Sequence, residues 1–125
     1  MSELPKEFWS FVREQARLRR EWRPLAEAVA EAAEKLLGEC EVYVFGSVAE
    51  GRQTAASDVD VLIIAEKLPQ KPSERRTLKI RIEDEANLPE YHPVQIHLIT
   101  KEEAKENPIY KNILKGTHIK IHTKN

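Results

Sequence analysis

A glycine-serine loop followed by two aspartates constrains this chain more than any other stretch. The apolar run Val42–Phe45 ends at Gly46-Ser47, and ten residues, 48–57, separate Ser47 from Asp58. Asp58-Val59-Asp60 then opens a second apolar run. Alternate residues of a strand point to one face, so Asp58 and Asp60 share a face with their Cα atoms about 7 Å apart. The pattern predicts two strands joined by a loop, with both carboxylates near that loop.

Two carboxylates on one strand face repel each other. At 4 Å and an effective dielectric constant of 20, the repulsion between two unit charges is about 4 kcal/mol. A bound cation, an arginine or a shared proton would relieve it. The identity of the compensating group is therefore the main functional question that the sequence poses.

The loop suggests which compensating group to expect. If the two strands are antiparallel neighbours, Gly46-Ser47 lies beside Asp58 and Asp60. Glycine lets the backbone approach a phosphate closely, and the Ser47 hydroxyl and nearby amides can donate hydrogen bonds to it. Carboxylates on the adjacent strand suit Mg²⁺, which would bridge phosphate oxygens in a phosphoryl or nucleotidyl transfer. The alternative is structural: Gly46 and Gly51 are turn residues, and Ser57-Asp58 closes a turn before a core strand.

The rest of the chain alternates helical and strand-like patterns. Val61–Ile64 is apolar at every position, which predicts a strand covered on both faces. Thr100 and Glu103 have the spacing of a capping box. The other predicted elements are helices over 6–20, from Pro24 to Gly38, from a capping Ser73 to about Asn87 and over 108–115, and strands over 94–99 and 118–122. This order indicates an α/β (α+β) fold with helices packed on a small mixed sheet.

Composition excludes several classes of protein. Twenty basic and 21 acidic residues give a net charge of −1, which does not favour general binding to nucleic acid. Cys40 is the only cysteine, so a disulfide scaffold is excluded. No apolar run approaches the roughly 20 residues that span a bilayer, and residues 1–20 are charged throughout. We therefore expect a soluble, cytoplasmic protein.

Two features of the first helices leave alternatives open. The basic stripe is either a solvated helix face or a face that binds a partner or phosphate. The aromatic patch either packs on the sheet or docks a partner. The basic stripe comprises Arg13, Arg17, Arg19, Arg20 and Arg23, and the aromatic patch comprises Phe8, Trp9, Phe11 and Trp22.

The motif over residues 42–65 resembles the signature of the DNA polymerase beta-like nucleotidyltransferase superfamily. The shared pattern is Gly46-Ser47, then Gly51-Arg52, then Asp58-Val59-Asp60 at the start of an apolar strand. The short chain resembles the minimal nucleotidyltransferase branch. The resemblance implies one nucleotidyltransferase-like domain over 1–125, with N-terminal helices in 1–40, a motif-bearing core in 41–99, and helical turns with a possible edge strand in 100–125.

The same resemblance implies roles for individual residues. Asp58 and Asp60 would be catalytic metal ligands for two Mg²⁺ ions, and Gly46 and Ser47 would hold the triphosphate of an NTP, which we expect to be ATP. Arg52 would contact phosphate, or else would be a loop arginine in water. The implied reaction transfers NMP, expected to be AMP, with release of pyrophosphate.

This sequence departs from the family pattern at the third acidic position. Active members carry a carboxylate on a later strand, and the matching stretch here is Val94-Gln95-Ile96-His97-Leu98. Gln95 is the best match. Its amide can coordinate weakly through oxygen but cannot neutralise a cation or accept a proton, and His97 is a substitute candidate for the base. We expect the chain to bind Mg-NTP and to transfer slowly or not at all.

Proteins that resemble this branch are often antitoxins paired with a small helical HEPN-type toxin, and some transfer AMP to a tyrosine of that partner. The leading hypothesis is therefore an Mg-dependent enzyme that modifies a partner protein hydroxyl. The alternative is a non-catalytic module of the same fold that neutralises a helical partner. A transferase for a small molecule is a third reading, in which a homo-oligomer would supply the acceptor pocket.

Overall fold

Four strands form one mixed sheet in the computed structural model, which describes residues 3–54 and 56–122. The strands are β1 (Cys40–Phe45), β2 (Val59–Ala65), β3 (Val94–Thr100) and β4 (His118–Ile121), in the order β3-β2-β1-β4. β1 is antiparallel to both β2 and β4, whereas β2 and β3 are parallel. The first two strands are antiparallel neighbours, as the predicted site requires, and the predicted edge strand near the C-terminus is confirmed.

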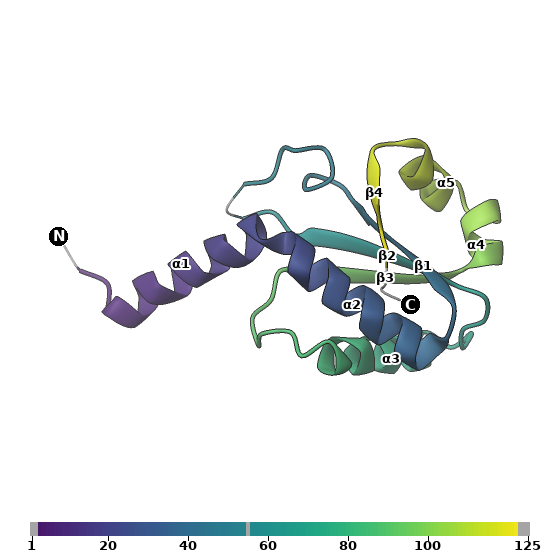
Figure 1. The fold of residues 1–125 in the computed structure, drawn as a ribbon, viewed down its shortest axis with the longest axis horizontal. Helices are drawn as coiled ribbons and strands as arrows, with labels where there is room; N and C mark the ends of the chain where they lie inside the picture. The colour runs from purple at the N-terminus through teal and green to yellow at the C-terminus, as the bar shows by residue number, and fades with distance from the viewer. Residues whose placement is uncertain (1–2, 55, 123–125) are drawn as a thin grey trace.

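Helices cover both faces of this sheet (Figure 1). α2 (Trp22–Leu37) and α3 (Pro72–Glu85) pack on one face, where their buried side chains meet Val61 and Ile63 of β2. α4 (Lys101–Glu106) and α5 (Pro108–Lys115) pack on the other face, against a smaller cluster of Leu62, Ile64 and Ile99. Burial on both faces explains why β2 is apolar at every position after Asp60.

The helix ends lie within two residues of those predicted, but the predicted cap of α3 differs. Thr100 and Glu103 form the predicted capping box at the start of α4. The prediction that Ser73 caps α3 is wrong: the helix begins at Pro72, Lys71 is the N-cap, and no side chain caps it. Proline at the first helical position has the required φ and lacks an N–H that would otherwise need a partner, so a capping serine is not needed.

α1 (Lys6–Arg20) extends away from the sheet (Figure 1). The structure describes this helix throughout, and Leu18 is its only buried residue. Of the aromatic patch, Phe8, Trp9 and Phe11 are exposed, whereas Trp22 packs against the core. Within the described residues, no helix is both long and apolar enough to cross a membrane.

Candidate functional site

The predicted site residues meet at one end of the sheet. Phe45, the last residue of β1, pairs with Asp60, and Asp60 pairs with Gln95. Gly46 and Ser47 directly follow Phe45, so the loop, the second aspartate and Gln95 occupy neighbouring positions across three strands. The structure thus brings together residues that are up to 49 positions apart in the sequence, from Gly46 to Gln95.

Gly46 lies directly against the Asp60 carboxylate. Its φ is +77°, and a Cβ added there would be 2.8 Å from Asp60 Oδ2. The position therefore needs glycine for two reasons: the left-handed backbone conformation and the space taken by the carboxylate. Because Gly46 has no side chain, its backbone can line the carboxylate side of the site.

The loop after Gly46 is closed by its own backbone. The Glu50 N–H donates to the Gly46 carbonyl at 3.1 Å, and the Arg52 N–H donates to the Ser47 carbonyl at 2.9 Å. Val48 anchors this turn in the core with 4% exposure. The Arg52 guanidinium lies 2.7 Å from the Glu50 carboxylate, and the two side chains are 70% and 39% exposed. Phosphate contact by Arg52 stays a prediction. It would require the guanidinium to break its ion pair with Glu50, or to bind Glu50 and a phosphate at the same time.

The two aspartates have different surroundings. Val59 between them is fully buried, whereas Asp58 is exposed and Asp60 is half-buried. This alternation is the one expected when both carboxylates lie away from the core face that buries Val59. The Val59 N–H donates to the Pro93 carbonyl at 2.9 Å, which joins the start of β2 to the start of β3.

His97 contacts Asp60. Its Nε2 lies 3.3 Å from Asp60 Oδ1, and its ring packs edge-on against Phe45 with a centroid distance of 5.2 Å. In register, His97 pairs with Leu62 and lies two residues after Gln95 in β3. The sequence proposed His97 as a base but gave no sign of this contact, because it joins strands 37 residues apart.

Gln95 occupies the position beside Asp60 and is exposed. Among the described residues, no group of three or more His, Cys, Asp or Glu side chains could hold a metal ion. Two carboxylates nevertheless fit Mg²⁺ when it arrives with a nucleotide, because Mg²⁺ commonly binds one or two carboxylates together with phosphate oxygens and waters. The donor set therefore suits a metal-nucleotide complex better than a metal ion alone.

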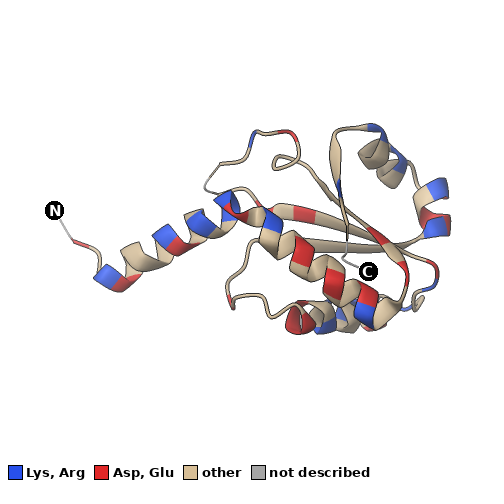
Figure 2. Cartoon of the chain, viewed as in Figure 1, with Lys and Arg blue, Asp and Glu red and all other residues tan. Residues whose placement is uncertain are grey.

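The basic stripe separates into residues with different partners. Arg17 binds Glu14 and Glu21 on the exposed side of α1, and these two carboxylates raise the pKa of Arg17 above its ordinary value. Arg23 lies over the ring of Trp22. Acidic and basic residues are interspersed along α1, whereas α2 carries mainly acidic residues between Arg23 and Lys35 (Figure 2). For Arg17 the solvated-face interpretation is the one that its contacts support.

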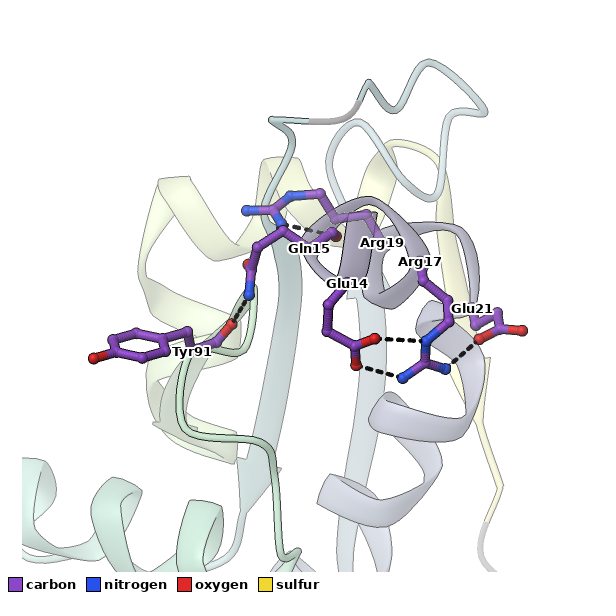
Figure 3. A network of polar contacts seen from close by, with 6 residues as sticks. All are labelled: Glu14, Gln15, Arg17, Arg19, Glu21 and Tyr91. Atoms are coloured by element: carbon purple, nitrogen blue, oxygen red, sulfur yellow. Dashed lines mark hydrogen bonds and ion pairs between the residues drawn. The ribbon is translucent and has the colours of Figure 1, made fainter. Parts of the chain in front are cut away.

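Arg19 instead turns toward the site. Its Nε donates to the Ser57 carbonyl at 2.8 Å, and its Nη1 donates to the backbone and side-chain oxygens of Gln15, each at 3.0 Å. Gln15 Nε2 donates to the Tyr91 carbonyl at 2.6 Å (Figure 3). We call this the Arg19–Gln15 bridge. Sequence reasoning missed it, because an arginine that binds backbone carbonyls leaves no pattern in the residues it contacts.

Comparison with known proteins gives consistent results. The model of the nucleotidyltransferase domain family matches residues 26–120. A crystal structure of a candidate nucleotidyltransferase from Sulfolobus solfataricus superposes with a TM-score of 0.55 at 21% identity, covering 73% of this chain and 78% of the other. The crystal structure of another candidate nucleotidyltransferase superposes with a TM-score of 0.54 at 23% identity, covering 75% of this chain and 94% of the other. At such identities the two structures show a shared fold alone. No curated protein sequence matches the chain.

Proposed function

This chain belongs to the nucleotidyltransferase domain family, and we propose that its site binds Mg-NTP and transfers NMP to a hydroxyl of a partner protein. The observation that carries the proposal is the position of Asp60. Its carboxylate lies against the Gly46 backbone, and the residue pairs in register with both Phe45 and Gln95. A glycine loop that lies beside carboxylates suits a nucleotide that carries its own cation.

Each residue has a defined task in this proposal. Backbone amides at Gly46 and Ser47, with the Ser47 hydroxyl, would donate to phosphate oxygens. Asp58 and Asp60 would hold the cation, which when bound stabilises negative charge on the phosphates. The acceptor oxygen would then bond to the α-phosphorus while the bond between that phosphorus and the bridging oxygen breaks, and pyrophosphate leaves. We take the nucleotide to be ATP, as the resemblance implies.

Gln95 sets the expected rate. In the transfer, the acceptor hydroxyl must lose a proton, and an amide cannot accept one. The proton would pass to water, so transfer by the wild type should be slow. His97 is already in contact with Asp60, and in this proposal it orients that carboxylate rather than acting as the base. Gln95→Glu would restore an acceptor beside Asp60.

The proposed acceptor is a tyrosine of a helical partner of the HEPN type, and the proposed biological role is that of an antitoxin. The exposed part of α1 supports a protein partner: Phe8, Trp9 and Phe11 have 41–49% of their surface accessible. Rings exposed together on a helix are a common feature of protein-binding surfaces.

Labelled ATP tests the transfer directly. Wild type and Gln95→Glu would be incubated with Mg²⁺, α-labelled ATP and the product of a neighbouring gene as the proposed partner. We expect weak labelling of that protein by the wild type and stronger labelling by Gln95→Glu. If only Gln95→Glu transfers label, the natural chain is not an active enzyme, although its site is complete in every other respect. If neither transfers label, the transferase proposal is wrong for this partner.

The absent third carboxylate also favours a second candidate function, a non-catalytic module that neutralises the same partner. This function predicts that a double variant, Asp58→Asn with Asp60→Asn, still binds and neutralises the partner. Loss of both properties in a variant that remains folded would exclude it.

A further inference from the structure

The Arg19–Gln15 bridge joins α1 to two separate loops. One loop leads into β2 through Ser57, the residue directly before Asp58. The other leads into β3 through Tyr91, four residues before Gln95. Because Arg19 also donates to Gln15, the two loops are connected through two side chains of one helix. The bridge therefore reaches the loops that lead into both strands of the candidate site, and Figure 3 shows its part from Arg19 through Gln15 to Tyr91.

The bridge reinforces a contact that the strands already make. The Val59 N–H donates to the Pro93 carbonyl, and the parallel register of β2 and β3 begins at the same level. Ser57 is two residues before Val59, and Tyr91 is two residues before Pro93. The bridge therefore holds together the segments that precede β2 and β3, just outside the first hydrogen bond between them, where strand ends otherwise fray.

Apart from the bridge, α1 is attached mainly through Leu18 and through an edge-on contact between the rings of Phe11 and Tyr91. Leu18 is its only buried residue, with all of α1 described by the structure. The family match begins at residue 26, after α1 has ended. Arg19 is half-buried, and the oxygens that it contacts belong to neutral groups. A planar guanidinium suits this task because its donors have a fixed fork geometry.

We propose that Arg19 and Gln15 are positioning residues, which hold Asp58 and Gln95 in the geometry that binds Mg-NTP. The nucleotide part of this inference rests on the proposed function. Loss of the bridge should loosen the first residues of β2 and β3 while the rest of the sheet stays intact. α1 then belongs to the support of the site, although it lies outside the matched family domain.

Three variants separate geometry from charge and from general stability. Arg19→Met removes every donor but keeps the apolar stem. Arg19→Lys keeps the charge but has no fork with which to reach the Ser57 and Gln15 oxygens together. Arg20→Met is the matched control, because Arg20 is an exposed arginine on the next position of the same helix.

Amide hydrogen exchange of the full chain without nucleotide tests the structural step. In Arg19→Met we expect the Val59 amide to exchange about tenfold faster, the effect of losing hydrogen-bonded support worth about 1.4 kcal/mol. Arg20→Met should match the wild type, and amides of β1 should be unchanged in every variant. Unchanged exchange at Val59 in Arg19→Met would overturn the proposal, whatever the nucleotide measurements give.

Calorimetric titration with Mg-ATP, at a temperature where all variants are folded, tests the functional step. We expect affinity to fall about tenfold in Arg19→Met, the usual range for loss of a residue that supports metal ligands, with Arg19→Lys intermediate and Arg20→Met unchanged. The Mg²⁺ dependence of ATP binding should weaken as well, which loss of stability alone would not cause. Faster exchange with unchanged affinity would show a merely structural bridge and refute the positioning role. Failure of the wild type to bind Mg-ATP would instead refute the proposed function, and the exchange data would still decide whether the bridge holds the loops.

Discussion

Replacing Gly46 with alanine should weaken nucleotide binding as well as folding, whereas the same replacement at Gly51 should weaken folding alone. The added Cβ would lie 2.8 Å from Asp60 Oδ2, whereas ordinary contact begins at 3.4 Å. The carboxylate must therefore move by about 0.6 Å, the difference between those two distances. Such a movement would also disturb the 3.3 Å contact between Asp60 and His97.

Gly51 provides a matched control for the cost to the backbone. It has a φ of +72°, close to the +77° of Gly46, and a Cβ added there would meet nothing within 4 Å. Alanine in the left-handed region costs about 1–2 kcal/mol, so both variants should lose that amount of folding stability. The carboxylate is the end of a side chain and can rotate, so we expect little further loss of stability at Gly46.

The two variants should differ in Mg-ATP affinity. Misplacing a ligand by about 0.6 Å at a site that depends on geometry should cost on the order of tenfold in binding. We expect that loss in Gly46→Ala and an affinity close to wild type in Gly51→Ala, measured by calorimetry, with stability measured by urea denaturation. Equal affinities in the two variants would refute the view that the space beside Asp60 matters for binding.

Three further predictions concern stability and reactivity. Ile82→Ala should lower the free energy of unfolding by about 2–5 kcal/mol, because Ile82 is the fully buried residue of α3. Ile80→Ala, at an exposed position of the same helix, should change it by less than about 0.5 kcal/mol, and urea denaturation would measure both. Burial alone would raise the pKa of Glu103, but hydrogen bonds from the Thr100 N–H and from Arg75 outweigh it and lower the pKa below 4.5. The ionised carboxylate therefore stabilises the fold above pH 4.5, and this stabilisation is lost as the pH falls through the lowered pKa. The free energies of unfolding of wild type and Glu103→Gln should differ at pH 7 and converge in acid, and a difference that is constant with pH would contradict this. Burial, with a contribution from Glu34, raises the pKa of the Cys40 thiol to about 11. Iodoacetamide at pH 8 should therefore alkylate Cys40 about a hundredfold more slowly in the folded protein than in the unfolded chain. Equal rates would show that the folded protein has an accessible thiolate.

The elements of the sheet could be predicted because their patterns are local. A strand buried on both faces is apolar at consecutive positions, as in Val61–Ile64, and a capping box has a fixed spacing, as in Thr100 and Glu103. The site prediction assumes that the first two strands are antiparallel neighbours, and the structure has this pairing. From that pairing alone, the sequence placed Gly46 beside Asp60.

The contacts that the sequence did not predict join residues far apart in the chain. His97 meets Asp60 because a parallel crossover places β3 beside β2, and no local pattern records that register. Arg19 looked like the other arginines of α1, and only the path of the loops puts the Ser57 carbonyl within its reach. The error at Ser73 is different: two residues suited to a helix start are adjacent, and Pro72 takes the first helical position.

Calorimetry with a non-hydrolysable ATP analogue tests the central claim most directly. The titration would be made with and without Mg²⁺ on the wild type and on Asp58→Asn and Asp60→Asn. We predict binding that requires Mg²⁺ and that is lost in both variants while their folding stability is retained. Binding that is equal without Mg²⁺, that survives both substitutions, or that is absent from the wild type would contradict the assignment of Asp58 and Asp60 to a metal-nucleotide site.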